Sequence, residues 1–153
     1  MAKKKIIYID MDDVLCDFFN TYLAALKQHP EIKYPQSQIG FFRDLPPIKN
    51  AIESVKYLVA QEHFDVYILT APSIKNPHCY TEKRLWVENY LGIDMVKKLI
   101  ISCNKGLNKG DYLIDDYIEG KGQENFEGKI LHFGSEEYLN WEEIIFYFNR
   151  IKC

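Results

Sequence analysis

The chain has 153 residues, of which 47% are hydrophobic and 14% aromatic, and its formal net charge is -3 at pH 7. This length is enough to bury a core without disulfides, and the apolar content excludes a disordered chain. The negative charge argues against a general nucleic-acid or membrane-surface binder, which would carry a basic face. We therefore expect one domain over residues 1–153, with no nucleic-acid polymer and no membrane among its partners.

The cysteines and the N-terminus indicate where the protein acts. Cys16, Cys79, Cys103 and Cys153 form no Cys-x-x-Cys pair, and none has a histidine at zinc-finger spacing. Reduced thiols in a cytosolic protein are the simplest interpretation. The apolar run after Lys3–Lys5 is four residues long, which is too short for a signal peptide or a membrane span. The sequence thus predicts a cytoplasmic protein.

The first strand candidate carries a group of acids. Four apolar residues, Ile6–Ile9, run directly into Asp10, Asp12 and Asp13. A short β-branched run without a polar break is typical of a strand buried on both faces. The acids would then lie at its carboxyl end, where open α/β sheets bind ligands. Asp10 and Asp12 are near enough in sequence to converge on one hard cation, whereas a solvated acidic turn is the alternative.

An irregular segment follows. Apolar residues at helical spacing predict a helix over 17–28, which Pro30 ends. The stretch from there to Pro47 has no regular pattern and contains Phe41 and Phe42. Long irregular loops in compact domains are often lids or binding loops. A connector whose phenylalanines pack on the core is an equal alternative.

The rest of the chain alternates helices with strands, which predicts an α/β fold with a parallel five-stranded sheet and helices on both faces. Gly92 is expected to end one helix, and Asn140 with Glu143 to cap the start of another. The predicted helices are 48–61, 80–91 and 141–151, and the predicted strands after the first are 64–69, a strand within 95–102, 112–114 and 129–133.

A polar side chain of a type used in catalysis or ligand binding follows each of the first four predicted strands. Because a parallel sheet gathers the carboxyl ends of its strands at one edge, these residues would share one site. Their types suit phosphoryl transfer, in which a carboxylate attacks phosphorus, a cation neutralises charge and a second carboxylic acid moves protons. The residues are Asp10 and Asp12, Thr70, Lys105, and Asp115 with Asp116.

This constellation resembles the haloacid-dehalogenase (HAD) superfamily of phosphatases, and within it the 5′(3′)-deoxyribonucleotidase family. The resemblance runs from about the first strand to the fifth. It implies a three-layer α/β/α Rossmann-like HAD core with a small, reduced cap at about 17–47. It rests on residues 10–18 (Asp-Met-Asp-Asp-Val-Leu-Cys-Asp-Phe), 69–72 (Leu-Thr-Ala-Pro), 82–87 (Glu-Lys-Arg-Leu-Trp-Val) and 113–116 (Leu-Ile-Asp-Asp).

The resemblance also implies a reaction: Mg²⁺-dependent hydrolysis of (deoxy)nucleoside monophosphates through an aspartyl-phosphate. Asp10 would be the nucleophile and Asp12 the general acid and base. Mg²⁺ would be held by the Asp10 carboxylate, the Asp12 backbone carbonyl and Asp116, with Asp115 beside this ligand set. The implied phosphate-binding residues are Thr70, Lys105 and Lys83, and Phe18 would line the substrate pocket.

Two features depart from the family pattern. Asp13 stands where the superfamily commonly has Gly, which adds negative charge beside the metal. The region before Ile48 is shorter than the cap of the animal enzymes and lacks a Trp to serve as an aromatic wall. Phe41 and Phe42 would take the place of that Trp. A broader small-molecule phosphatase is therefore an alternative.

Two rivals belong to other classes. A receiver-type signalling domain would place a phosphorylated Asp after a central strand, but the second strand ends in Thr70 and the third in Ser102–Asn104. A catalytically silent domain that only binds a nucleotide or a partner would not need the intact set of acids. The sequence leaves open the base and sugar, the 5′ or 3′ position, a homodimer, and whether the insert closes over substrate.

Overall fold

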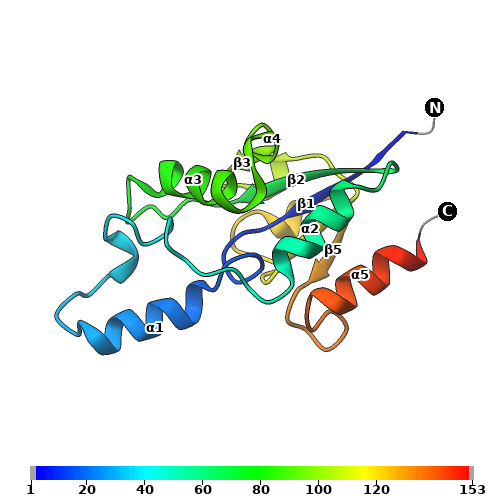
Figure 1. The fold of residues 1–153 in the computed structure, drawn as a ribbon. Coiled ribbons are helices and arrows are strands. Elements are labelled where there is room, and N and C mark those ends of the chain that lie inside the picture. Colours follow the sequence, from blue (N-terminus) through cyan, green and yellow to red (C-terminus); the bar gives the residue numbers. More distant parts are fainter. Residues whose placement is uncertain (1–2, 152–153) are drawn as a thin grey trace.

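The computed structural model describes residues 3–151 and contains a five-stranded sheet in which every pairing is parallel (Figure 1). The strand order is β3-β2-β1-β4-β5, so the first strand lies at the centre. This confirms the predicted α/β fold class. The strands are β1 (Lys5–Ile9), β2 (Phe64–Thr70), β3 (Leu99–Ile101), β4 (Tyr112–Asp115) and β5 (Lys129–His132).

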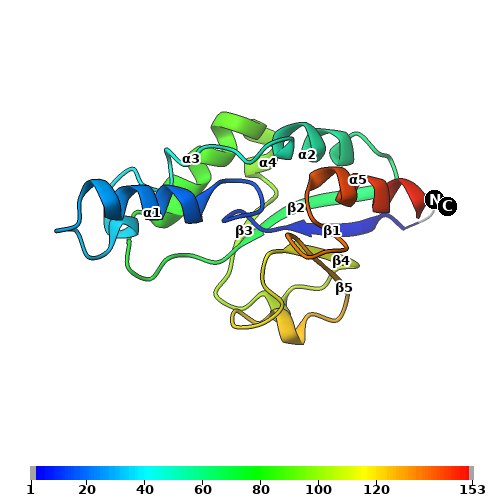
Figure 2. The same ribbon diagram turned by 90° about the horizontal axis from the view of Figure 1, so that it is seen from below.

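One face of the sheet carries the α-helices. Side chains alternate along each strand, so Ile7 and Ile9 point into the larger core, whereas Tyr8 points to the opposite face. Helices α2 to α5 bury their apolar residues in that larger core, and Figure 2 shows them on the same side of the sheet. The helices are α1 (Phe18–Gln28), α2 (Ala51–Val59), α3 (Cys79–Leu91), α4 (Ile93–Val96) and α5 (Trp141–Arg150).

The opposite face is covered by the connections from β3 to β4 and from β4 to β5 (Figure 2). Right-handed crossovers place them there, because the chain reverses its direction across the sheet after β3. Each connection contains a 3-10 turn, Lys105–Leu107 in the first and Gln123–Asn125 in the second. The α-helices that pack on the sheet therefore lie on one face, whereas the sequence predicts helices on both. Phe126 packs its ring edge-on against Tyr8 and closes the smaller core.

Local signals in the sequence are confirmed at two helix ends and at the third strand. Gly92 ends α3 with φ +86, and the Asn140 side chain accepts a hydrogen bond from the Glu143 amide at 3.1 Å. The strand predicted within 95–102 is β3, Leu99–Ile101, and it follows the helical turn Ile93–Val96, whose Met95 is buried.

Helix α1 and the segment up to Pro47 form a lobe beyond the carboxyl end of the sheet (Figure 1). None of the residues of α1 is fully buried. Its first turn is capped by Asp17, whose side chain accepts from the Asn20 amide at 3.2 Å. A 3-10 turn, Pro35–Ser37, follows α1, and the segment after it contacts α3 through a hydrogen bond from the Gly40 amide to Glu82. The lobe is therefore positioned beside the strand ends that carry the acids.

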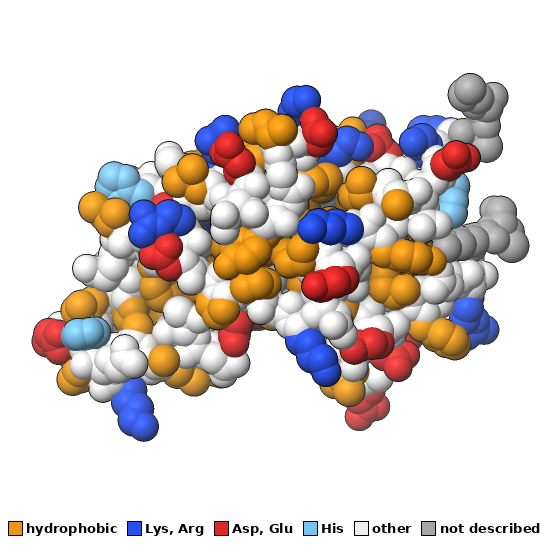
Figure 3. Space-filling model, in the orientation of Figure 1, with side chains coloured by type: hydrophobic (Ala, Val, Ile, Leu, Met, Phe, Trp, Pro, Cys, Tyr) orange, Lys and Arg blue, Asp and Glu red, His pale blue; other side chains and the backbone are white. Residues whose placement is uncertain are grey.

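The surface and the cysteines agree with the composition. Figure 3 shows side chains of both charges scattered over one face of the molecule. Within residues 3–151, Cys16 and Cys79 are buried free thiols and Cys103 is an exposed one, while Cys153 lies outside the described range. Among the described residues, no helix is both long and apolar enough to cross a membrane.

Candidate active site

The strand ends that carry the candidate residues lie side by side. Ile9 pairs with Ile68 of β2 and with Ile114 of β4, so Asp10 emerges between the ends of both neighbouring strands. The Asp10 amide donates to the Ile114 carbonyl at 2.9 Å and extends the β1–β4 ladder to the acid. The parallel register thus brings Asp10, Thr70 and Asp115 to one edge, as the sequence predicts.

Lys105 lies between two of the acids. Its Nζ is 2.9 Å from Asp10 Oδ1 and 2.5 Å from Asp115 Oδ2, and its side chain is 1% exposed. The Lys105 amide donates to the Lys121 carbonyl at 2.8 Å, so the loop after β3 is bound to the loop after β4. Gly122 is needed at this crossing, because it has φ +85 and a Cβ there would clash with Asn104 Oδ1.

Three carboxylates converge at this edge. Asp10, Asp115 and Asp116 each offer an oxygen within 4.8 Å of the others. Burial raises the pKa of Asp10, but the charges of Lys105 and Lys83 outweigh it, so the pKa falls below its usual value. Burial and the Asp10 charge raise the pKa of Asp115, and burial together with Asp10 and Asp115 raises the pKa of Asp116 to about 8.

These shifts indicate that the cluster holds more negative charge than its lysines balance. Carboxylate oxygens at this spacing are the ligands that a divalent cation such as Mg²⁺ prefers. A bound cation would favour the ionised form of Asp116, whose raised pKa reflects burial beside two other acids. The residues present therefore fit a magnesium site.

Asp115 is held by neighbours on both oxygens. Oδ1 accepts from the Tyr117 amide at 3.0 Å, and Oδ2 accepts from Lys105 and from Gln123 Nε2 at 3.3 Å. Gln123 also accepts from the Lys121 amide at 2.8 Å, so it shapes the loop after β4. The sequence gives no signal for Gln123, which lies in a loop rich in Gly and Glu and acts only through tertiary contacts.

A second network joins Thr70, Lys83 and Asp12. Lys83 reaches from α3 and donates to Thr70 Oγ1 at 2.6 Å, to the Ala71 carbonyl at 2.9 Å and to Asp12 Oδ2 at 2.9 Å. Burial lowers the pKa of Lys83, but Asp12 and Asp10 outweigh it and raise the pKa above its usual value. The ammonium group has three N–H donors, and each has an acceptor here. This buried lysine therefore holds Asp12 and the end of β2 together.

The pocket beside the cluster measures about 180 Å³, and Asp10, Asp12, Lys105 and Asp116 all line it. Its aromatic side is formed by Phe18, Phe19 and Tyr117. Phe19 and Tyr117 are 58% and 62% exposed at its edge, and the sequence analysis gives them no role. An adjoining groove of about 710 Å³ shares Phe19, Tyr117 and Asp116 and extends to Pro46–Lys49.

Phe41 and Phe42, which the sequence also predicts to bind substrate, lie behind Phe18. The Phe18 ring packs against Phe41 and Phe42 at centroid distances of 5.6 and 5.9 Å. Phe42 is 2% exposed and belongs to the main core, and neither ring lines the pocket. Their contact with the pocket therefore passes through Phe18.

The comparisons with known proteins agree with this geometry. The family model for the 5′ nucleotidase, deoxy (pyrimidine), cytosolic type C protein matches residues 27–145. A Vibrio phage KVP40 protein, named as a candidate 5′(3′)-deoxyribonucleotidase, is 41% identical over 147 residues, which cover 94% of this chain and 84% of that protein. The human 5′(3′)-deoxyribonucleotidase of the cytosolic type is 30% identical, with 95% and 81% covered. The chain belongs to this nucleotidase family.

A solved structure supports the fold. The crystal structure of a candidate HAD-hydrolase, YfnB from Bacillus subtilis bound to magnesium, superposes with a TM-score of 0.65 at 13% identity. The match covers 97% of this chain and 100% of that one. The resemblance inferred from the sequence is thus confirmed at the level of family and fold, and the protein is an enzyme of the phosphatase class.

Asp13 shows how the chain departs from the family pattern without losing the turn. It has φ +60, the left-handed conformation that glycine adopts readily and that Asp tolerates better than most residues. Its Oδ1 accepts from the Phe19 amide at 2.9 Å and satisfies a donor at the start of α1. Asp13 therefore keeps the backbone of a glycine and adds a contact to the first turn of the lobe.

This conformation gives a stability prediction. The free energy of unfolding of Asp13→Gly is expected to exceed that of Asp13→Ala by about 1 kcal/mol. Both variants lose the hydrogen bond from the Phe19 amide, but only alanine is strained at φ +60. Urea denaturation of the two variants measures the difference. Equal values would mean that the turn relaxes out of the left-handed region.

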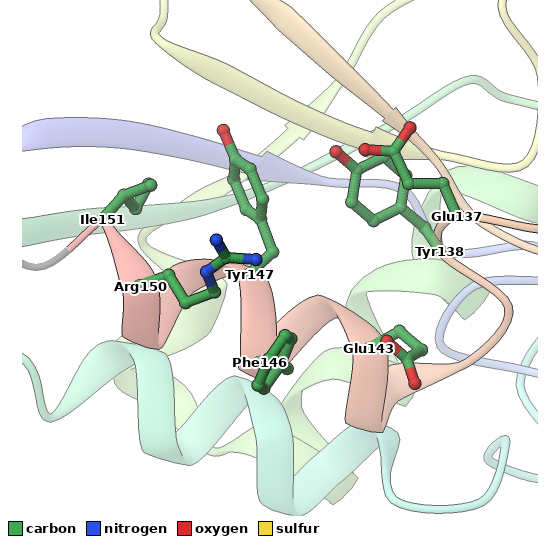
Figure 4. Close-up of a pocket in the computed structure, with 7 residues that line it drawn as sticks. All are labelled: Glu137, Tyr138, Glu143, Phe146, Tyr147, Arg150 and Ile151. Atoms are coloured by element: carbon green, nitrogen blue, oxygen red, sulfur yellow. The ribbon is translucent and has the colours of Figure 1, made fainter.

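A larger hollow of about 480 Å³ lies away from the strand ends (Figure 4). Figure 4 shows its lining residues on α5, with Phe146, Tyr147 and Arg150, and on the preceding loop, with Glu137 and Tyr138. It contains none of the strand-end residues. The chemistry of the lining, rather than the volume, identifies the smaller pocket as the active-site candidate.

Proposed function

We propose that this protein is a Mg²⁺-dependent phosphatase that hydrolyses (deoxy)nucleoside monophosphates to nucleoside and phosphate. The observation that carries the proposal is the bridge from Lys105 to Asp10 and Asp115, with Asp116 beside it, at one side of an open pocket. The names of the curated relatives support a deoxynucleotide as the substrate. The family's substrate class and the charge of the cluster agree, because a phosphate dianion needs both a cation and a lysine.

Asp10 is the proposed nucleophile. An oxygen of its carboxylate forms a bond to phosphorus while the bond from phosphorus to the nucleoside oxygen breaks, which gives an aspartyl-phosphate. Asp12 gives a proton to the leaving oxygen and later accepts one from the water that attacks the phosphoenzyme. The ion pair of Asp10 with Lys105 supports this role, because it holds the carboxylate in its ionised form.

The magnesium ligands in this proposal are the Asp10 carboxylate, the Asp12 backbone carbonyl and Asp116, with Asp115 beside them. A bound ion would neutralise charge on the phosphate oxygens and orient them for displacement. Lys105 would donate to the phosphate, and Thr70 would contribute its hydroxyl with Lys83 behind it. The hydrogen bonds of Asp115 to Lys105 and Gln123 support its place beside the ligand set.

The nucleoside would lie against Phe18, with Phe41 and Phe42 supporting that ring from behind. We propose that residues 17–47 are a reduced cap on a single HAD-like domain that spans residues 1–153. The cytosolic type of the human relative supports the cytosol as the place of action.

Phosphate release from a panel of substrates tests this function. The panel contains dUMP, dTMP, UMP, AMP, 3′-monophosphates and p-nitrophenyl phosphate, each with and without Mg²⁺. We expect a preference for pyrimidine deoxynucleotides. Activity on p-nitrophenyl phosphate alone would indicate a broader small-molecule phosphatase. An absence of Mg²⁺-dependent release from every substrate would favour a silent binding domain.

Metal dependence has its own prediction. EDTA is expected to stop turnover and excess Mg²⁺ to restore it, and Mg²⁺ should raise the melting temperature because it relieves repulsion among three acids. The shift in melting temperature should shrink in Asp116→Asn, which loses one ligand, and should persist in Asp65→Asn, whose carboxylate pairs with Lys98 on the surface. A shift of equal size in both variants would place the ion elsewhere.

A further inference from the structure

The lobe is bound to α3 through a buried carboxylate. Glu82 is 4% exposed, and each of its two oxygens accepts a backbone amide from the lobe. Oε1 accepts from Gly40 at 2.5 Å and Oε2 accepts from Phe42 at 3.0 Å. A buried carboxylate is costly unless it is hydrogen-bonded, so these two amides are what allow Glu82 to lie there.

Two other buried side chains hold the same segment. Asn76 is fully buried, and its Nδ2 donates to the carbonyls of Gln36 and Gln38 at 3.0 and 3.3 Å. Trp86 is also fully buried, and its Nε1 donates to the Leu45 carbonyl at 2.8 Å. The backbone of residues 36–45, which we call the wall segment, is thus hydrogen-bonded at five positions to side chains within residues 76–86.

The wall segment connects to the catalytic candidates at Phe42. Its ring lies 5.3 Å from the Lys83 ammonium and packs against Phe18, which lines the pocket. Lys83 follows Glu82 directly in the chain and binds Asp12 at 2.9 Å. Two consecutive residues of α3 therefore hold different parts of the site: Glu82 holds the wall segment, and Lys83 holds Asp12, the proposed general acid.

We propose that Glu82 is a positioning residue that keeps the wall segment in place as a rigid support behind Phe18, which lines the substrate pocket, and that this segment is not a lid. The inference rests on the proposed function for the identity of the substrate. A lid motion of residues 40–42 would break both amide hydrogen bonds to the Glu82 carboxylate, and hydrogen bonds to a charged group are among the stronger ones. Glu82 acts on substrate through Phe42 and Phe18, so its effect belongs to binding rather than to the chemical step.

Glu82→Gln tests the proposal, because glutamine keeps the shape but has one oxygen acceptor and turns an NH₂ group toward the second amide. The amides of Gly40 and Phe42 should exchange with deuterium at least about tenfold faster than in the wild type. The KM for the best nucleotide should rise about threefold or more, while kcat changes less than about twofold. Glu82→Ala, which removes both acceptors, should show larger effects on exchange and KM.

Glu88→Gln is the matched control, because Glu88 lies on the same helix and pairs with Arg84 at the surface. It should change neither amide exchange nor KM. If Glu82→Gln fails to fold, Asn76→Ala tests the same wall segment from the bonds to Gln36 and Gln38. Exchange is measured without substrate, so its outcome is independent of nucleotidase activity. Unchanged exchange, or a loss confined to kcat, would overturn the role of Glu82.

Discussion

Asp10→Asn is expected to lower kcat at least about a thousandfold, because an amide oxygen does not form an acyl phosphate with the substrate. Asn has nearly the same shape as Asp, and the backbone bond from residue 10 to Ile114 is retained. Lys105 also keeps Asp115 as its ionic partner. Circular dichroism should therefore show a folded protein, with a change of no more than about 2 kcal/mol in the free energy of unfolding.

Asp111→Asn is the control for this change. Asp111 precedes β4 at the amino end of the sheet, where it accepts from the Ile6 amide and pairs with Lys5. The same substitution there should leave kcat within about twofold of the wild type. Mass spectrometry of the quenched wild type should find a phosphoryl group on the peptide that contains Asp10. A folded Asp10→Asn enzyme with more than about a tenth of the wild-type kcat would exclude Asp10 as the nucleophile.

The position of the site follows from sequence periodicity because a parallel sheet has one carboxyl edge. Once Ile6–Ile9 and the strand before Asp115 are recognised as buried strands, the two acid groups must lie close together. The same logic brings Thr70 to that edge. Strand periodicity does not fix the position of Lys105, because that position depends on two loops whose backbones cross at Gly122.

The residues that sequence reasoning misses act through tertiary hydrogen bonds. Gln123 holds Asp115, and Glu82 holds two amides about forty residues earlier in the chain. A polar residue inside a helical pattern is normally solvated, and its burial depends on what packs over it. Phe41 and Phe42 show the same limit, because apolar character alone does not distinguish a wall that touches substrate from a core that supports it.

The covering of the second face has a similar explanation. The alternation of strands with helices predicts helices on both faces, but the segment between β4 and β5 is rich in glycine and short of apolar residues at helical spacing, which is typical of a loop. Its 3-10 turn is enough because Phe126 fills the small core above Tyr8 and Leu113. The connection instead supplies Tyr117, Lys121 and Gln123 to the pocket.

Lys105→Met should produce the largest loss of stability. The methionine keeps the length of the side chain but leaves Asp10 and Asp115 without the ammonium that lies 2.9 and 2.5 Å from them. Removing one partner from a buried ion pair costs about 3–5 kcal/mol, because the remaining charges stay desolvated. Urea unfolding at pH 7 with EDTA present measures this loss, and turnover should fall with it because the phosphate loses a donor.

Lys109→Met in the same loop is the matched control, because Lys109 is exposed and its backbone carbonyl, which the substitution keeps, accepts the hydrogen bond from the Tyr8 hydroxyl. It should change the free energy of unfolding by less than about 0.5 kcal/mol. A double variant, Lys105→Met with Asp115→Asn, should lose less than the sum of the single variants by about 1 kcal/mol or more, since one buried charge no longer needs the lysine. Additive losses would mean that the Lys105–Asp115 contact contributes little to stability.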